Sequence, residues 1–95
     1  MFELTGFQRD LLYVIAGLDG PKGLAIKDEL ELVYGKEINP GRLYPNLNTL
    51  VEKGLVTKES VDDRENSYSL TDHGHREIDS RRKWEQKYLD ERQSS

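Results

Sequence analysis

Residues 38–56, Ile-Asn-Pro-Gly-Arg-Leu-Tyr-Pro-Asn-Leu-Asn-Thr-Leu-Val-Glu-Lys-Gly-Leu-Val, decide the fold. The pattern predicts a helix over residues 41–53 that is followed at once by a β-strand. Asn39 can cap this helix, and Gly54 stands where a left-handed residue would end it. Because Pro45 cannot donate a hydrogen bond to the carbonyl one turn earlier, we expect the regular helix to begin late, around Leu43.

This helix has one apolar and one polar face. Leu43, Leu47, Leu50 and Val51 follow the spacing that places side chains on a single stripe. The opposite face carries Arg42, Pro45, Asn48, Thr49 and Glu52, flanked by Asn46 and Lys53. Arg, Asn and Thr side chains can bond base edges and phosphates in a DNA major groove. An ordinary solvated surface is the alternative, so this stretch alone leaves both interpretations open.

Length and composition predict one small domain. The chain has 95 residues, of which 35% are hydrophobic and 34% charged, so its core is small and oligomerisation would add stability. The absence of cysteine excludes a disulfide framework and a thiolate metal site, and fits a reducing interior. No apolar run approaches the ~18 residues of a membrane span, and Glu3 and Arg9 interrupt any signal peptide. We expect a cytoplasmic, nucleoid-associated protein.

The charge balance opposes simple nucleic-acid binding. The net charge is −4 and the pI about 5.2, whereas DNA-binding domains are usually basic. The charges are unevenly spread, however: residues 61–79 carry two basic and six acidic side chains, and residues 21–60 carry six of each. A neutral or locally basic binding face can therefore coexist with an acidic surface.

Two shorter helices are expected before the central one, over residues 6–18 and 24–34. Thr5 can cap the first of them, and a Gly- and Pro-containing turn separates the two. Their inward side chains are predicted to be Phe7, Leu11, Val14, Ile15 and Leu18 in the first and Ile26, Leu30 and Val33 in the second. The short connection after residue 34 makes the second and central helices a helix-turn-helix candidate.

Two short strands, over residues 55–60 and 67–71, are predicted to form a hairpin after the central helix. Three helices followed by a hairpin are the plan of a winged helix. A last helix over residues 72–91 has few apolar positions, and its Trp84, Tyr88 and Arg81 form a set typical of interfaces. The sparse stripe favours dimerisation against the first helix of a partner; the alternative is a frayed, solvated terminal helix.

Three motifs carry a resemblance to a known family. They are Pro-Gly-Arg-Leu-Tyr-Pro-Asn-Leu at residues 40–47, Leu-Val-Glu-Lys-Gly-Leu-Val at residues 50–56, and Tyr-Ser-Leu-Thr-Asp-His-Gly at residues 68–74. With these spacings the chain resembles the PadR family of winged-helix transcriptional regulators. Residues 7–12 and the turn near Gly20 are most similar to its archaeal members. The resemblance spans about residues 5–89 and implies a short, single-domain, mainly α protein with a small β-hairpin.

The resemblance implies a homodimer that places two central helices in successive major grooves of double-stranded DNA. The DNA contacts it implies are Arg42, Tyr44, Asn46, Asn48 and Thr49 on or beside the groove face, Lys53 and Lys58 on the backbone, and Arg64 at the wing tip over the minor groove. Lys27, Asn39, Gly41, Pro45 and Asn66 complete the expected set. The dimer interface it implies joins Phe2, Leu4, Phe7 and Leu11 to Ile78, Arg81, Trp84, Tyr88 and Leu89.

Two features depart from the family pattern. Larger members carry a long C-terminal helical domain, whereas only one helix is expected here after the wing, so a small-molecule effector is not expected, although the sequence does not exclude one. The wing tip, Asp62-Asp63-Arg64-Glu65, is acidic, and its carboxylates would repel DNA phosphates.

Other functions find less support in the sequence. His73 and Glu77 stand four residues apart on a predicted helix, but two ligands are few for a metal site, and no serine has an apparent catalytic base. We therefore expect neither an enzyme nor a cofactor. The expected function is a sequence-specific repressor. The alternatives are an architectural or plasmid-partition protein that spreads along DNA, and a winged helix used for protein–protein contact.

Overall fold

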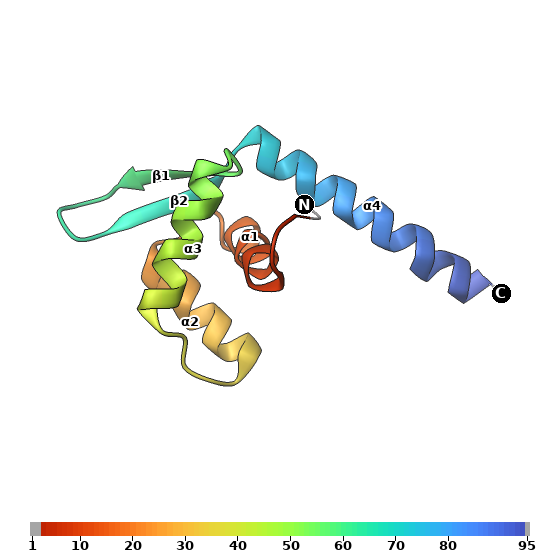
Figure 1. The fold of residues 1–95 in the computed structure, drawn as a ribbon, viewed down its shortest axis with the longest axis horizontal. Coiled ribbons are helices and arrows are strands. Elements are labelled where there is room, and N and C mark those ends of the chain that lie inside the picture. Colours follow the sequence, from red (N-terminus) through yellow and green to blue (C-terminus); the bar gives the residue numbers. More distant parts are fainter. Residues whose placement is uncertain (1–2, 95) are drawn as a thin grey trace.

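The structure is a computed structural model that describes the backbone of residues 3–94 and the side chains of residues 3–89. Its elements follow the chain as α1 (Gly6–Leu18), α2 (Gly23–Tyr34), α3 (Pro40–Glu52), β1 (Val56–Ser60), β2 (Asn66–Leu70) and α4 (Asp72–Ser94). Figure 1 shows the three short helices packed together, the hairpin projecting to one side and α4 to the other. The predicted winged helix-turn-helix is confirmed, with most element ends within one residue of their expected positions.

Helix α1 forms the centre of the core. Thr5 and Gln8 make a reciprocal capping box at its start, in which each side chain bonds the other residue's backbone N–H. Phe7, Leu11 and Ile15 are buried as predicted. The prediction that Leu18 faces inward is wrong, because the chain turns away immediately afterwards at Asp19, which has a left-handed backbone.

Helix α2 begins at Gly23 and ends at Tyr34, and Gly35, whose φ of 69° is left-handed, caps it. Ile26 and Leu30 are fully buried, as expected. Val33 was expected to face inward but is 64% exposed. The next side chain covers the core at this end instead: the Tyr34 ring packs against Phe7, with 6.2 Å between ring centroids.

Helix α3 begins at Pro40, before the late start that was expected around Leu43. Asn39 caps it through a 2.7 Å bond from the Gly41 amide to its side-chain oxygen. The amides of Arg42 and Leu43 bond the Asn39 carbonyl at 2.9 and 3.0 Å, so the first turn is already regular. The expectation of a late start is wrong because Pro45 faces outward, where its ring fits and only one backbone bond is lost.

The hairpin packs on the helices through its second strand. Strands β1 and β2 are antiparallel, with Val56 opposite Leu70 and Ser60 opposite Asn66. Tyr68 is 2% exposed, and its amide donates a 2.8 Å bond to the Pro21 carbonyl just before α2. This bond fixes the hairpin beside the start of α2, and thereby beside α3.

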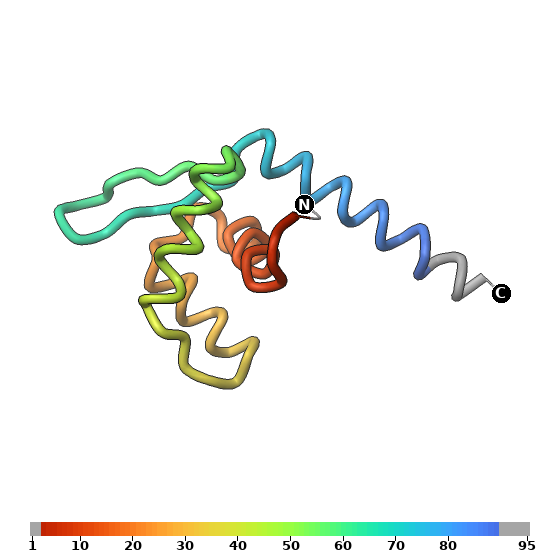
Figure 2. Tube along the Cα trace, in the orientation of Figure 1, coloured from red at the N-terminus to blue at the C-terminus, as the bar shows by residue number. Residues whose placement is uncertain are grey.

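Helix α4 starts against the hairpin and then leaves the body. Gly74 must be glycine here, because a Cβ would lie 2.2 Å from the Leu55 carbonyl oxygen. Ile78 is buried, but the helix continues past it to the C-terminal side (Figure 2), which gives the molecule its extents of 54 × 30 × 22 Å. Within the described residues, no helix has both the length and the apolar content that crossing a membrane would require.

Candidate nucleic-acid interface

The outward face of α3 is exposed and carries several of the predicted residues. Leu43, Leu47 and Leu50 on its inner side are fully buried, which fixes the rotation of the helix. The residues turned to solvent on the opposite side are Gly41, Pro45, Asn48 and Glu52. The predicted division into an apolar and a polar face is therefore confirmed.

Arg42 lies on the flank of α3 that faces α1. Its guanidinium carbon is 4.0 Å from the centroid of the Phe7 ring, a cation–π arrangement. The residue is still exposed, so it can reach an anion next to α1. The stacking directs it away from the centre of the outward face.

Asn46 is partly buried and bonds within the chain. Its amide nitrogen donates to the Arg42 carbonyl at 2.7 Å, and its side-chain oxygen accepts from Gln8 Nε2 at 3.0 Å. These two bonds fix the orientation of the Asn46 amide, which keeps a second N–H and a second lone pair, so its contact with DNA stays a prediction. Gln8, which joins α1 to α3, was missed by the sequence analysis; its place in the capping box was the available signal.

Asn48 and Lys58 bring α3 and β1 together on the exposed surface. Lys58 Nζ lies 3.4 Å from Asn48 Oδ1, and both residues are exposed. Because Asn48 is exposed, a base edge could accept a hydrogen bond from its amide nitrogen. Thr49, one residue on, donates its hydroxyl to the Pro45 carbonyl at 3.0 Å, so it lines the face with its methyl group.

Lys27 has a structural role in the turn between α2 and α3. Its Nζ lies 2.9 Å from Glu31 Oε2, and the same carboxylate accepts a 2.9 Å bond from the Ile38 amide. The Ile38 amide and then Lys27 lower the pKa of Glu31. The Lys27 ammonium therefore helps to hold the turn, and its contact with DNA stays a prediction. Lys53 is exposed at the other end of α3.

Two acidic residues of the wing tip, Asp62 and Glu65, have structural partners. Asp62 Oδ1 accepts from the amides of Arg64 and Glu65, at 2.8 and 2.9 Å, and so shapes the tip. Glu65 Oε2 forms a 3.0 Å ion pair with Lys22 at the start of α2, and this partner raises the pKa of Lys22. Lys22 was missed by the sequence analysis, because nothing local links residue 22 to residue 65.

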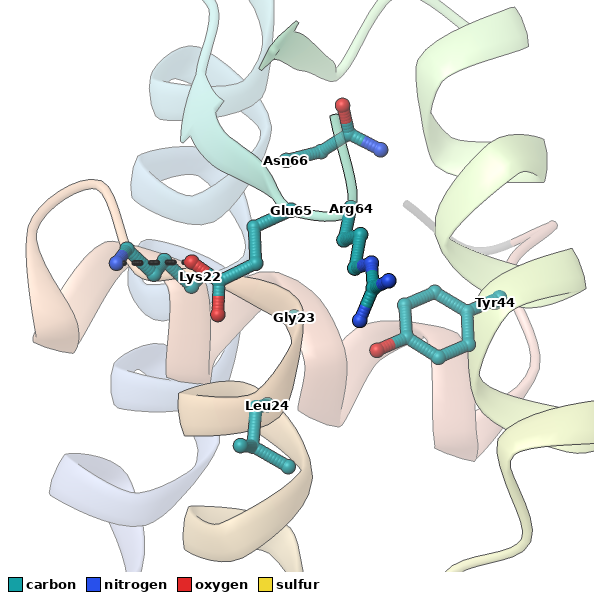
Figure 3. A pocket seen from close by; sticks show the side chains of 7 residues that line it. All are labelled: Lys22, Gly23, Leu24, Tyr44, Arg64, Glu65 and Asn66. Atoms are coloured by element: carbon teal, nitrogen blue, oxygen red, sulfur yellow. Dashed lines mark ion pairs between the residues drawn. The ribbon is translucent and has the colours of Figure 1, made fainter. Parts of the chain in front are cut away.

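A hollow of about 320 Å³ lies between the wing, the start of α2 and α3. It is lined by Lys22, Gly23, Leu24, Tyr44, Arg64, Glu65 and Asn66. In Figure 3 the Arg64 side chain extends from the wing toward the Tyr44 ring, back over the body of the protein. Arg64 thus belongs to the tip between β1 and β2, as expected, and its contact with the minor groove stays a prediction.

Most of the predicted dimer residues near the N-terminus are not available to a partner. Leu4, Phe7 and Leu11 are buried in their own chain, as is Ile78, which corrects the prediction that they face a second subunit. Phe2 lies outside the described residues. By contrast Trp84, Tyr88 and Leu89 are 42%, 50% and 54% exposed along α4.

These α4 side chains form an ordered surface, which we call the α4 apolar patch (Trp84, Tyr88 and Leu89). The Trp84 and Tyr88 rings meet edge to face with 5.3 Å between centroids. Arg81 stacks on the Trp84 ring at 4.4 Å. Among the described residues, no group of three or more His, Cys, Asp or Glu side chains is placed to hold a metal ion.

Comparison with known proteins shows which family the chain is similar to. The family model described as the transcriptional regulator PadR-like family matches residues 11–80. The transcriptional activator GvpE1 of Halobacterium salinarum is 32% identical over 62 residues, 65% of this chain and 32% of that protein. GvpE of Haloferax mediterranei is 35% identical over 46 residues, 48% of this chain and 24% of that protein. The chain thus spans about a third or less of these curated relatives.

The chain covers a larger share of the solved structures that it matches than of the curated relatives. A structure described as the complex of hsRosR-S1 superposes with a TM-score of 0.88 at 47% identity, covering 92% of this chain and 77% of that one. A structure of H. salinarum RosR gives a TM-score of 0.87 at 48% identity, covering 90% and 77%. MarR gives 0.70 at 25% identity, covering 92% and 61%.

Proposed function

The chain belongs to the PadR-like family of transcriptional regulators, and from this premise we propose that it binds a specific double-stranded DNA site as a homodimer. One observation carries the proposal: α3 is anchored by three fully buried leucines and turns Asn48 outward, next to Lys58 on the wing. A rigid helix with a hydrogen-bonding amide and an adjacent cation suits a major groove, whose floor carries base edges and whose walls carry phosphates.

The proposal assigns different tasks to the α3 side chains than the sequence did. Asn48 is the base-reading residue, because its amide is exposed at the centre of the face. Arg42 and Lys53 flank the helix and contact phosphates, as does Lys58 beside Asn48. Asn46 and Lys27 support the surface from within through Gln8 and Glu31.

We assign the dimer interface to α4. Exposed Trp, Tyr and Leu side chains in one stripe cost solvation free energy, which a second copy of the helix would remove. Pairing through α4 leaves both α3 helices uncovered, since α4 leaves the body on the side opposite the wing (Figure 1). The two α3 helices should then occupy half-sites about one helical turn, ~34 Å, apart.

We propose repression by occlusion of a promoter. Activation is the second candidate function, because the two GvpE relatives are both named transcriptional activators. A reporter gene with the selected site placed over or upstream of its promoter separates the two: lower transcription supports repression, and higher transcription supports activation.

The test of DNA binding is selection of bound duplexes from a random library with the purified chain. We expect enrichment of a pseudo-palindrome, occupied by two chains in sedimentation, with log K falling linearly with log salt. Footprinting on the selected site should give one discrete boundary; protection that spreads along the DNA would support the architectural alternative. A monomeric protein that enriches no sequence at moderate ionic strength would refute the proposal.

A further inference from the structure

We infer that the hollow between the wing, α2 and α3 is a binding site for one phosphate of the DNA backbone, held by the Arg64 guanidinium and the Tyr44 hydroxyl. This inference rests on the proposed DNA-binding function and deepens it. It replaces the expected minor-groove contact of Arg64 by a contact to the sugar-phosphate strand. It also explains why an acidic wing can lie next to DNA.

The first argument is the direction of the side chains. Arg64 comes from the wing and Tyr44 from α3, and in Figure 3 their polar ends converge over the start of α2. The space of about 320 Å³ is open to solvent and large enough for a phosphate group. A planar guanidinium matches two phosphate oxygens, and a phenol can donate to a third.

The second argument is the charge of the lining. The hollow is lined by two cations, Lys22 and Arg64, and one carboxylate, Glu65. Lys22 and Glu65 pair with each other at 3.0 Å, so the Arg64 charge is the one not offset within the lining. The Asp62 carboxylate nearby is turned to the backbone amides of the tip. The lining itself therefore carries one net positive charge, which favours an anion inside the hollow although Asp63 lies next to Arg64 in the chain.

The third argument is the packing of Tyr44. Residue 23 has no side chain, and a Cβ there would lie 2.8 Å from Tyr44 Cε1 and 2.9 Å from its hydroxyl oxygen. Gly23 therefore lets the ring lie close over the start of α2, with the hydroxyl at the hollow. Tyr44 remains 40% exposed, so a ligand can reach it.

The fourth argument is the place of the hollow beside α3. A helix in the major groove has a phosphate strand on each side, so groups that flank the helix meet the backbone rather than base edges. Arg42 flanks α3 on the side of α1, and Tyr44 flanks it on the side of the wing. The hollow is thus where the second groove wall would pass.

The decisive experiment measures how Arg64→Gln changes binding of the full-length chain to its selected DNA site across a salt series. Because a dimer carries two hollows, the slope of log K against log salt should become shallower by about 2. Affinity should fall roughly tenfold or more at low salt, equally for all sites. Arg76→Gln makes the same charge change on exposed α4 and should leave the slope nearly unchanged.

DNA with single methylphosphonate linkages identifies the phosphate. At one position per half-site, removing the charge should weaken the wild type and leave Arg64→Gln unaffected, because the partner of that phosphate is already gone. Tyr44→Phe should show a smaller loss at the same linkage. If no linkage behaves in this way, the hollow holds no DNA phosphate.

The remaining outcomes also decide the question. If Arg64→Gln changes preference at A·T or G·C pairs under the wing instead of lowering all affinities, Arg64 lies in the minor groove and the inference is wrong. A wild type that binds specifically and an Arg64→Gln variant with identical affinity and slope would overturn the inference alone. A wild type without specific binding would overturn the proposed function, and this inference with it.

Discussion

Helices α1 and α4 differ in how they cover their apolar side chains. Helix α1 buries Phe7, Leu11, Leu12 and Ile15 against its own chain, whereas α4 buries Ile78 near its start and leaves the α4 apolar patch exposed. The first arrangement closes the core within one chain; the second leaves an apolar surface that a second copy would cover in the proposed dimer. On the proposed function, DNA recognition and assembly belong to different regions, and substitutions should separate them.

The largest expected effect is the loss of folding when the body loses a core side chain. Leu47→Ala removes a fully buried side chain under the DNA-facing helix and should lower the free energy of unfolding by about 2–5 kcal/mol. Urea denaturation measures this. Leu32→Ala, at a 79% exposed position on α2, should cost less than about 0.5 kcal/mol. An equal cost at both positions would mean that the Leu32 side chain is also covered in the folded protein, which would contradict the expected contrast between buried and exposed positions.

The next effect isolates α4. Trp84→Ala should weaken dimerisation by about 2 kcal/mol or more, since a large exposed aromatic side chain is a typical interface anchor. Sedimentation should show a lighter particle, with affinity lost for the two-half-site duplex but kept for a single half-site. Lys83→Ala, at a neighbouring exposed position, serves as control. An unchanged sedimentation mass would remove Trp84 from the interface.

A third prediction sharpens the division of labour on α3. Asn48→Ala should cost roughly 1–3 kcal/mol on the preferred site and relax the preference at one base pair. Arg42→Ala should weaken binding uniformly, because stacking on Phe7 directs the guanidinium to the flank. Binding of both variants to a panel of singly altered sites distinguishes them. A base-specific loss from Arg42→Ala would reverse the two roles.

The smallest effect tests the contact that holds α1 to α2. Burial, and then the hydrogen bond to Asp10, raise the pKa of Tyr34 to about 12. The fold thus favours the neutral phenol: its stabilisation is complete below the ordinary pKa near 10 and is lost as pH rises toward about 12. Tyr34→Phe should cost about 0.5–1.5 kcal/mol at neutral pH.

The same variant should flatten the alkaline decline of stability. Urea midpoints between about pH 9.5 and 11.5 should fall more steeply in the wild type than in Tyr34→Phe. Tyr88→Phe, half exposed on α4, should follow the wild type. Identical slopes for wild type and Tyr34→Phe would show that Tyr34 ionises in the folded protein as it does in the unfolded one.

The elements could be predicted because their signals are local. The spacing of Leu43, Leu47 and Leu50, the Asn39 cap and the left-handed Gly54 all lie within one short stretch. The wrong predictions of burial lie at helix ends, at Leu18 and Val33. Burial there depends on which other segment packs against the last turn. The start of α3 was misplaced because the cost of Pro45 was judged without knowing that its ring faces solvent.

The candidate interface was only partly predictable. The sequence shows which polar side chains α3 carries. It does not show which of them are hydrogen-bonded within the chain, because that depends on residues far away in the sequence. Gln8 donates a hydrogen bond to Asn46, 38 residues further along the chain. Lys22 forms an ion pair with Glu65, which is also far from it in the sequence. No periodicity in the chain encodes such pairs.

The sequence by itself determined the order of helices and strands and the two-faced character of α3, because hydrogen bonding and side-chain periodicity act over three or four residues. Only the tertiary structure decided that Leu4, Phe7 and Leu11 belong to the chain's own core and that Arg64 turns back toward Tyr44. Burial and electrostatic pairing depend on which segments meet in space, and that is set by the packing of the whole domain.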